Sequence, residues 1–276
     1  MTQDRIRQIV RLALAEDLGH GDLTTRLTVD PQTRARAEIA AKQDLVTAGL
    51  LPARLTFQEV DAAVEFEALA EDGQSVSKGN ILARLDGPAA PILTAERVAL
   101  NFLMRLSGVA TLTARFVAAV RGHKARIIDT RKTTPGLRLL EKAAVRAGGG
   151  ANHRFGLYDG ILIKDNHIAA AGSITQAVTR ARQGAPHTLK IEVEVVDAAG
   201  LQEAMAAGAE AVLLDNMTAA QISEAVRLAA GRVILEASGG INLANVAEIA
   251  AAGVDLISIG ALTHSAPAAD LSLNFV

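Results

Sequence analysis

The second half of the chain alternates short apolar runs with amphipathic stretches. Aliphatic and β-branched runs predict six strands, at 127–128, 161–163, 191–195, 211–214, 233–235 and 256–259. Between them, apolar residues at helical spacing predict helices at 139–146, 174–182, 201–206, 219–228 and 243–251. Strands and helices that alternate in this way form βαβ units around a parallel sheet. Six strands are fewer than the eight of a complete barrel, so the pattern fits either an incomplete α/β barrel or an open doubly wound sheet.

The first part of the chain is patterned differently. Apolar residues at helical spacing predict a helix over residues 4–18. Short alternating segments then predict strands at 34–41, 64–69 and 81–85. An apolar, helix-forming stretch from 94 to 120 predicts a helix that bridges two domains and is broken near Ser107-Gly108.

Composition excludes several kinds of protein. Half of the 276 residues are hydrophobic, so the chain can bury a large core, but only 3% are aromatic. The absence of cysteine excludes disulfides, thiolate metal sites and a cysteine nucleophile. The net charge of −2 and the scarce aromatics argue against nucleic-acid binding. Because no apolar run approaches the length of a membrane span and the N-terminus lacks a signal-peptide core, we expect a soluble, cytoplasmic protein without a membrane partner.

Positive charge is concentrated between residues 121 and 164. This segment holds ten Lys or Arg and three Asp or Glu, although the whole chain is slightly acidic. Such a segment predicts binding of a strongly anionic molecule, and a solvated basic helix face is the alternative. A triple glycine at 148–150 and the adjacent strands favour a binding site. In the stretch from Asp129 to His167, two histidines, His153 and His167, accompany the cations Arg131, Lys132, Arg138, Lys142, Arg146, Arg154 and Lys164.

Polar residues follow almost every predicted strand at its carboxyl end. In strand order they are Asp129, Arg131 and Lys132; Lys164, Asp165 and Asn166; Glu194; Asp215 and Asn216; Glu236, Ser238, Gly239 and Gly240; and Gly260. The active sites of α/β barrels are built from the loops at this face. Polar residues at the same end of successive strands therefore predict one shared site and favour the barrel over the open sheet.

The residue types at these ends suggest different tasks. The glycines of Ser238-Gly239-Gly240 and Gly260 would let backbone N–H groups approach a phosphate, with Asn242 or a neighbour capping the following helix. Glu194 and Asp215 offer hard oxygen ligands for Mg²⁺. They could equally form ion pairs with Lys132 and Lys164.

The histidines and serines show no familiar catalytic pattern. His153, next to Arg154, could donate to an anion or act as an acid, or it could be structural. The serines lack a His/Asp framework, and the histidines lack metal-ligand spacing. The residues together predict an electrostatic clamp for a substrate with several negative charges.

Several longer motifs resemble those of one enzyme family. They are DTRKTTPGLR (129–138), EKAAVRAGGGANHRFGLYDGILIKDNHI (141–168), IEVEV (191–195), LLDN (213–216), EASGGI (236–241) and GVDLISIGALTHS (253–265). In this order they resemble the quinolinate phosphoribosyltransferases, and EDLGHGDLTT (16–25) and ERVALNFLMRLSGVAT (96–111) look like N-terminal signatures of that family. The resemblance covers essentially the whole chain.

This resemblance implies a fold and a reaction. The fold would be an N-terminal α/β sandwich domain over residues 1–110 and an incomplete α/β barrel over 111–265, with the tail 266–276 packing back on the first domain. The reaction would join quinolinate to phosphoribosyl pyrophosphate (PRPP) with Mg²⁺, giving nicotinate mononucleotide, pyrophosphate and CO₂ for NAD biosynthesis. The family also implies a homodimer, which could assemble further into hexamers.

The resemblance also implies roles for individual residues. Arg131 and Arg154 would clamp the carboxylates of quinolinate, His153 and Lys132 would line that pocket, and Arg97 would be donated by the neighbouring subunit. Residues implied on the PRPP side are Lys164, Glu194, Asp215, Ser238, Gly239, Gly240 and Gly260. Of all these, Lys132, Lys164, Glu194 and Asp215 would be catalytic, and Glu194 and Asp215 would reach Mg²⁺ directly or through water. Strand alternation puts Glu192 on the same side as Glu194, so its role stays open.

Other functions remain compatible with the residues. A related phosphoribosyltransferase or pyrophosphorylase-like protein could act on another base, although Arg97, Arg131 and Arg154 are all present. Lys164 at a strand end could instead form a Schiff base in an aldolase or lyase, which borohydride trapping would detect. A non-catalytic protein would bind PRPP without turnover.

Overall fold

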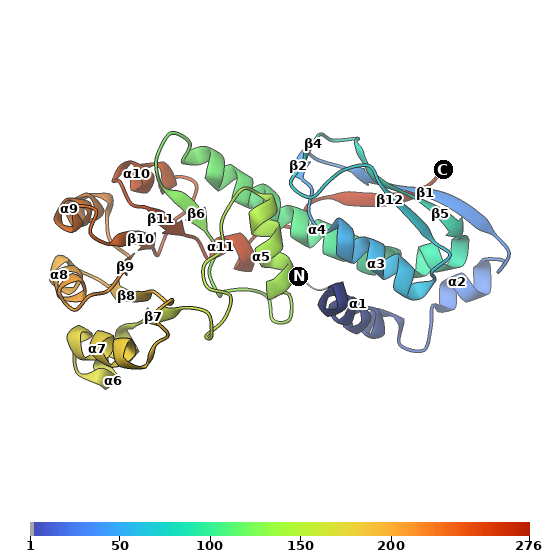
Figure 1. Cartoon of the computed structure of the whole chain (residues 1–276). Helices are drawn as coiled ribbons and strands as arrows, with labels where there is room; N and C mark the ends of the chain where they lie inside the picture. The colour runs from blue at the N-terminus through green and yellow to red at the C-terminus, as the bar shows by residue number, and fades with distance from the viewer. Residues whose placement is uncertain (1–2) are drawn as a thin grey trace. The chain divides into compact units, whose positions relative to one another are not determined.

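The computed structural model describes residues 3–276, which form two compact units (Figure 1). The first unit comprises residues 3–114, 134–149 and 265–276, and the second comprises 115–133 and 150–264. We expected one boundary after residue 110 and another after 265. The segment 134–149 instead belongs to the first unit, in which the buried Glu141 accepts hydrogen bonds from Arg105 at 2.7 and 3.0 Å.

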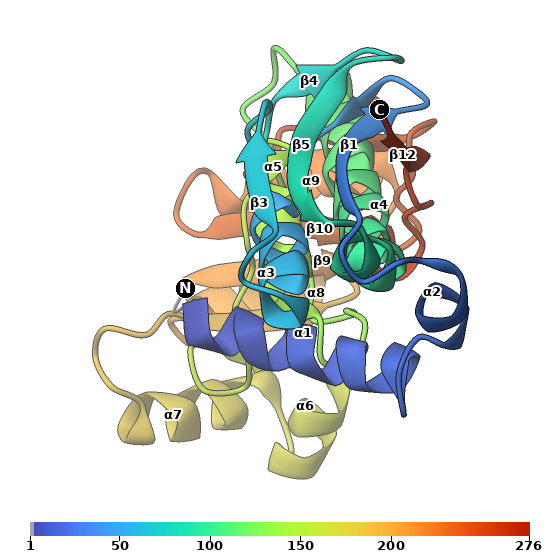
Figure 2. The same cartoon turned by 90° about the vertical axis from the view of Figure 1, so that its right-hand side faces the viewer.

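The first unit is built around an antiparallel sheet. Its strands run in the order β12 (Leu271–Phe275), β1 (Arg34–Ala41), β5 (Ile81–Pro88) and β3 (Glu65–Ala68), which lie side by side in Figure 2. Two short strands, β2 (Leu45–Val46) and β4 (Ser75–Val76), pair separately. The helices are α1 (Gln3–Leu18), α2 (Leu23–Thr28), α3 (Leu50–Val60), most of α4 (Ala89–Ala119) and α5 (Arg138–Ala147).

The end of the chain contributes to the core of this unit. β12 pairs with β1 so that Leu273 lies opposite Ile39. Leu271 and Leu273, two residues apart, both point inward and are buried. They join a core that includes Phe57, Leu82 and other fully buried residues.

Helix α4 is continuous, so the predicted break near Ser107-Gly108 is wrong. The Ser107 hydroxyl is buried and bonds to both the N–H and the carbonyl of Ala48. A Cβ at Gly108 would lie 2.0 Å from the Pro267 carbonyl oxygen. The glycine is needed because another part of the chain packs directly against the helix backbone there.

Two helices of the first unit were not predicted. α3 begins after Gly49, which is left-handed with φ 99°, and carries Pro52 within its first turn, where the missing N–H costs no hydrogen bond. α2 is only six residues long.

Helix α4 is long and apolar enough to span a membrane. Half of that apolar stretch is buried, with Ile92 and Leu103 in the core, so α4 is a core helix of the folded unit.

The second unit is a parallel sheet that curls into an incomplete barrel. Its strands are β6 (Arg126–Ile128), β7 (Ile161–Ile163), β8 (Ile191–Val195), β9 (Ala211–Asp215), β10 (Ile234–Ser238) and β11 (Leu256–Ser258). They run in the order β6-β11-β10-β9-β8-β7, so the first strand pairs with the last. Within the described residues β6 and β7 do not pair, and an isolated bridge from Ile128 to Ala151 extends the open edge. This order confirms the barrel and excludes the open doubly wound sheet.

The helices of this unit lie outside the strands (Figure 1). They are α6 (Asp165–Ala171), α7 (Ile174–Gly184), α8 (Ala198–Ala206), α9 (Ala219–Ala229), α10 (Val246–Ala251) and α11 (Ala261–His264). The predictions anticipated α7 to α10 but neither α6, which begins directly after β7, nor the short α11. α10 begins at Val246, three residues later than predicted, because Asn242 and Asn245 form a turn before it.

Candidate active site

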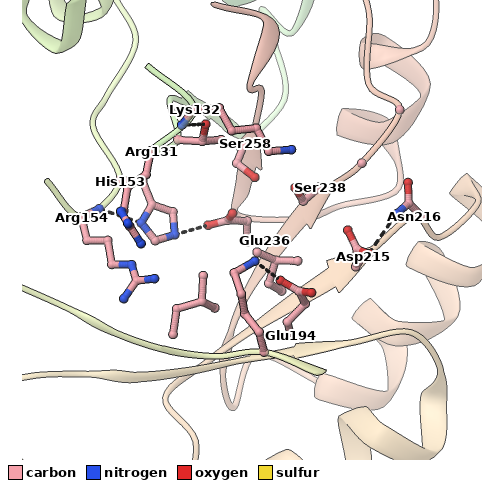
Figure 3. Close-up of a pocket in the computed structure, with 16 residues that line it drawn as sticks. Arg131, Lys132, His153, Arg154, Glu194, Asp215, Asn216, Glu236, Ser238 and Ser258 are labelled. Carbon is pink, nitrogen blue, oxygen red and sulfur yellow. Dashed lines mark hydrogen bonds and ion pairs between the residues drawn. The ribbon is translucent and has the colours of Figure 1, made fainter. Parts of the chain in front are cut away.

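The carboxyl ends of the strands in the second unit surround one cavity of about 510 Å³ (Figure 3). Its lining residues are Thr130, Arg131, Lys132, His153, Arg154, Leu162, Lys164, Glu194, Leu213, Asp215, Asn216, Glu236, Ser238, Gly239, Gly240 and Ser258. Most of the residues predicted from strand ends are among them. Asp129, Asp165, Asn166 and Gly260 do not line the cavity, which brings the other predicted strand-end residues together.

Strand register explains which side chains reach this cavity. Neighbouring strands are parallel, and Ser238 pairs with Asp215 while Glu236 pairs with Leu213. Residues two apart on a strand point to the same side, so β9 and β10 each send alternate residues inward. The intervening residues, such as Leu214 and Ala237, are buried on the other side.

Four cations line the cavity, namely Arg131, Lys132, Arg154 and Lys164. The Arg154 guanidinium donates to the Gly160 carbonyl at 3.0 Å. Burial lowers the pKa of Arg154, and the charge of Arg131 adds to this effect. Three other cations of the basic segment do not line the cavity. Arg138, Lys142 and Arg146 lie on α5, which belongs to the first unit.

A buried carboxylate supports the loop that carries His153 and Arg154. Asp129 is fully buried and accepts hydrogen bonds from the Asn152 amide at 2.6 Å and the His153 N–H at 2.9 Å. Further along, the Asp159 carboxylate accepts the backbone N–H groups of Phe155 and Gly156, each at 2.7 Å. These local bonds fix the backbone on both sides of Arg154.

Two carboxylates face the cations from β8 and β9. Glu194 accepts a hydrogen bond from the Lys164 ammonium at 2.5 Å, and Asp215 accepts one from the Asn216 amide at 2.9 Å. One of the ion pairs considered from the sequence therefore forms. Because carboxylate oxygens are the ligands that Mg²⁺ prefers, the donor set of Glu194 and Asp215 fits that ion.

Glycines shape the loop after β10. Gly239 has φ 93°, and a Cβ there would lie 2.2 Å from the Asn216 side-chain oxygen. Gly240 is also left-handed. Asn242 does not cap α10, since its carboxamide oxygen accepts the Ala244 N–H within the preceding turn. Gly260 does not line the cavity, but a Cβ there would lie 3.0 Å from the Lys132 side chain.

His153 contacts Glu236, which we predicted at a strand end without a specific role, and Glu192, whose role we left open. Its Nε2 lies 3.1 Å from Glu192 Oε2 and 3.6 Å from Glu236 Oε2. Its Nδ1 accepts the Arg154 N–H at 2.6 Å, which requires an unprotonated Nδ1. Both ring nitrogens are thus engaged by the protein, and the geometry corresponds to a neutral imidazole with its proton on Nε2.

The pKa values of this group reflect burial and mutual charge. Burial alone would lower the pKa of His153, but the hydrogen bond to Glu192 and the charge of Glu236 outweigh it, so the pKa is raised. Protonation of Nδ1 would break its bond with the Arg154 N–H, and we therefore assign the neutral form. Burial and the charge of Glu192 raise the pKa of Glu236 to about 8.

The same three side chains could in principle hold a metal ion. The ligand atoms of His153, Glu192 and Glu236 lie within 4.8 Å of one another. The 3.1 Å contact between His153 and Glu192 already satisfies both groups as a hydrogen bond. Sequence signals for this cluster were weak, because Glu192 precedes the strand end and a lone histidine has no ligand spacing.

Arg97 is not part of this cavity. It lies on α4 in the first unit, is exposed, and lines a separate hollow of about 370 Å³ with Asp17, Asp22 and Thr94. Within one chain, the structure therefore assembles the other predicted side chains without Arg97.

Comparison with known proteins matches nearly the whole chain. The family models described as the N-terminal and C-terminal domains of quinolinate phosphoribosyl transferase match residues 22–107 and 109–274. The chain is 45% identical over 274 residues to a probable nicotinate-nucleotide pyrophosphorylase (carboxylating) of Bacillus subtilis, covering 99% of this chain and 94% of the relative. It is 40% identical to a quinolinate phosphoribosyltransferase (decarboxylating) of Nicotiana tabacum, covering 97% of this chain and 81% of the relative.

Solved structures agree. A nicotinate-nucleotide pyrophosphorylase from Francisella tularensis superposes with a TM-score of 0.96 at 41% identity, covering 100% of this chain and 98% of that one. A human nicotinic acid phosphoribosyltransferase shares the fold at a TM-score of 0.67 and 14% identity, over 98% of this chain and 74% of that one. Since both family domains match in order and together span nearly the whole chain, this protein belongs to the quinolinate phosphoribosyl transferase family.

Proposed function

We propose that this enzyme transfers the phosphoribosyl group of PRPP to quinolinate and releases the C2 carboxylate, giving nicotinate mononucleotide, pyrophosphate and CO₂. The observation that carries the proposal is the composition of the cavity. Arg131, Lys132, Arg154 and Lys164 line it together with the carboxylates Glu194 and Asp215 and the glycine loop after β10. A dicarboxylate and a sugar phosphate carrying pyrophosphate need these complementary charges. The names of the relatives specify the same two-part activity.

The two arginines suit quinolinate. The planar guanidinium of Arg131 or Arg154 can bind a carboxylate through two parallel hydrogen bonds, which a lysine cannot do. The bond from Arg154 to the Gly160 carbonyl holds that side chain in a defined position. His153 and Lys132 line the same part of the cavity.

The lysines, the two carboxylates and the glycine loop suit PRPP. Lys132 and Lys164 would neutralise the departing pyrophosphate, and Glu194 and Asp215 would approach the ribose hydroxyls. The loop Ser238-Gly239-Gly240, with Gly260 close to Lys132, would receive the 5′-phosphate through backbone N–H groups. Glu194 and Asp215 would also hold Mg²⁺, directly or through water, and the ion would neutralise phosphate charge when bound.

The reaction requires no protein nucleophile. The pyridine nitrogen attacks the anomeric carbon as pyrophosphate leaves, so the protein's task is to align two reactants and stabilise developing charge. Because the cations of the cavity are positioned by the fold before substrate binds, little reorganisation is needed during reaction.

We further propose that the enzyme works in the cytoplasm as a homodimer in which Arg97 completes the neighbouring site. The exposure of Arg97 and its absence from the cavity of its own chain support this proposal. Mixed dimers of Arg97→Ala and Lys132→Ala chains should regain part of the activity that each variant lacks. Absence of rescue would contradict donation between subunits.

The activity is tested by incubating the protein with quinolinate, PRPP and Mg²⁺ and following nicotinate mononucleotide and CO₂ together. Equal amounts of both products from quinolinate, and no product from nicotinate, are expected. Turnover of nicotinate would move the function to a related phosphoribosyltransferase. PRPP binding without product from either base would contradict an enzymatic role in this reaction.

A further inference from the structure

We propose that Glu236 is the acid that protonates C2 of the pyridine ring after CO₂ has left. This inference rests on the proposed function and assigns a residue to its second step. Glu236 lies in the middle of β10, its side chain is 1% exposed, and it lines the cavity (Figure 3). It is a buried carboxyl group at the wall of a site that also holds four cations, the carboxylates Glu194 and Asp215 and a glycine loop.

The second step needs a proton donor. When the C2–carboxylate bond breaks, its electron pair stays on C2 and CO₂ departs, leaving a carbanion beside the positively charged ring nitrogen. In the product C2 carries hydrogen. The O–H bond of Glu236 would break as the C2–H bond forms, which leaves Glu236 as a carboxylate. Water that enters after product release would return the proton.

The geometry gives Glu236 an oxygen for this task. Oε2 lies 3.6 Å from His153 Nε2, whereas Oε1 has no hydrogen-bond partner among the described residues. Buried polar atoms are normally paired, so this unpaired carboxyl oxygen, in a residue that lines the cavity, is left for another partner. Ser258, on the adjacent strand β11, lies beside it (Figure 3).

The surroundings keep this carboxyl protonated at neutral pH. The groups that face it are Glu192 from β8, the neutral His153 and the Ser258 hydroxyl, while β9 contributes the apolar Leu213. Burial and the negative charge of Glu192, together with a hydrogen bond to Glu192, raise the pKa of Glu236 to about 8, against the smaller opposing effect of the Ser258 hydroxyl. A donor whose pKa lies near the working pH is well matched to general acid catalysis.

Two other proton carriers of the cavity, His153 and Lys164, are engaged elsewhere. The Nε2 proton of His153 points to Glu192, and Nδ1 has no proton to give. Lys164 is paired with Glu194. Glu236 therefore combines burial, a position in the cavity wall and a retained proton.

The test uses Glu236→Gln in the full-length enzyme. Glutamine matches the neutral acid in size but cannot donate such a proton. In the wild type, pyrophosphate and CO₂ should form in equal amounts. In Glu236→Gln, pyrophosphate release should stay within a few-fold of wild type, while CO₂ release should fall about 100-fold or more, in keeping with the usual contribution of a general acid. Ribosylated quinolinate with both carboxylates should then accumulate, because the carbanion recaptures CO₂.

Two further measurements separate proton donation from a structural role. CO₂ release by the wild type should decline as the pH rises through about 8, and this decline should be absent in Glu236→Gln. Glu236→Asp keeps an acid and should recover part of the CO₂ release. Glu248→Gln, on the exposed face of α10, serves as the matched control and should behave as wild type.

The outcomes distinguish this inference from the proposed function. If Glu236→Gln released CO₂ and pyrophosphate equally at the wild-type rate, Glu236 would not be the acid. An equal loss of both products, with no recovery in Glu236→Asp, would assign it a structural role and overturn the inference. If the wild type released no pyrophosphate with quinolinate, the proposed function would fail and the inference with it.

Discussion

The Lys164 ammonium lies 2.5 Å from the Glu194 carboxylate and joins the ends of neighbouring strands β7 and β8. The lysine side chain is 45% exposed, so this pair contributes little to folding stability. Its effect is local, because it holds a cation and a carboxylate together at the cavity wall. Substrate phosphates would compete with Glu194 for the same ammonium.

Lys164→Met should therefore impair the reaction without unfolding the protein. We expect kcat/KM for PRPP to fall about 10- to 100-fold, the loss associated with one charge-assisted hydrogen bond. The melting temperature should be nearly unchanged. Lys78→Met, on an exposed turn of the first unit, is the control. An unaltered kcat/KM in Lys164→Met would contradict the proposed contact between Lys164 and PRPP.

Arg154→Lys should weaken quinolinate binding selectively. Lysine keeps the charge but loses the planar fork and the positioning bond to Gly160. We expect KM for quinolinate to rise about 10-fold or more while KM for PRPP changes little, as loss of a charged hydrogen bond predicts. Arg180→Lys, on the exposed side of α7, is the matched control. Equal changes in both KM values would argue against a carboxylate clamp.

Gly108→Ala should destabilise the first unit. The added Cβ would lie 2.0 Å from the Pro267 carbonyl oxygen, so the helix or the chain end must move. Overpacking of this kind costs about 1–3 kcal/mol, measurable by urea denaturation. At Gly184, the last residue of α7, no atom lies within 4 Å of the added Cβ, and Gly184→Ala should be neutral or slightly stabilising. Similar stabilities for the two variants would show that the contact at Gly108 relaxes easily.

Arg105→Met should destabilise the protein more than removal of a surface arginine. Arg105 donates to Glu141, whose side chain is fully buried. Removing one partner of such a pair leaves a buried charge, at a cost of about 3–5 kcal/mol. Arg227→Met breaks the exposed pair with Glu224 and should change the unfolding free energy within experimental error. If Arg105→Met and Arg227→Met were equally stable, the Glu141 carboxylate would not be left as an unpaired buried charge, and water would have to solvate it in Arg105→Met.

The stability of the protein should depend on the protonation of Glu236. Its pKa is raised to about 8 by folding, so the folded state holds a proton that the unfolded state releases at lower pH. The corresponding stability is present below the unfolded pKa and is lost as the pH rises toward 8. Glu236→Gln should therefore show a flatter fall in unfolding free energy between pH 5 and pH 9 than wild type or Glu248→Gln. Parallel curves for all three proteins would contradict the raised pKa.

The local pattern of apolar residues was sufficient to predict the strands of the barrel. β-branched runs such as Ile191–Val195 recur between amphipathic helices, and this alternation permits few arrangements other than a parallel sheet. The same reasoning located most of the cavity, because the carboxyl ends of parallel strands meet at one face. Asp215 and Ser238 were thus predicted at neighbouring strand ends, and they pair in the sheet.

Tertiary structure decided the features that depend on contacts between distant segments. Gly108 does not break α4, because the Pro267 segment packs against it, and 134–149 joins the first unit through Glu141 and Arg105. The strand pattern, the polar strand ends and the family resemblance follow from the amino-acid sequence alone, since these features are carried by neighbouring residues. Only the folded chain brings Glu236, Glu192 and His153 within a few ångströms, and it is burial and mutual charge at that distance that set their protonation.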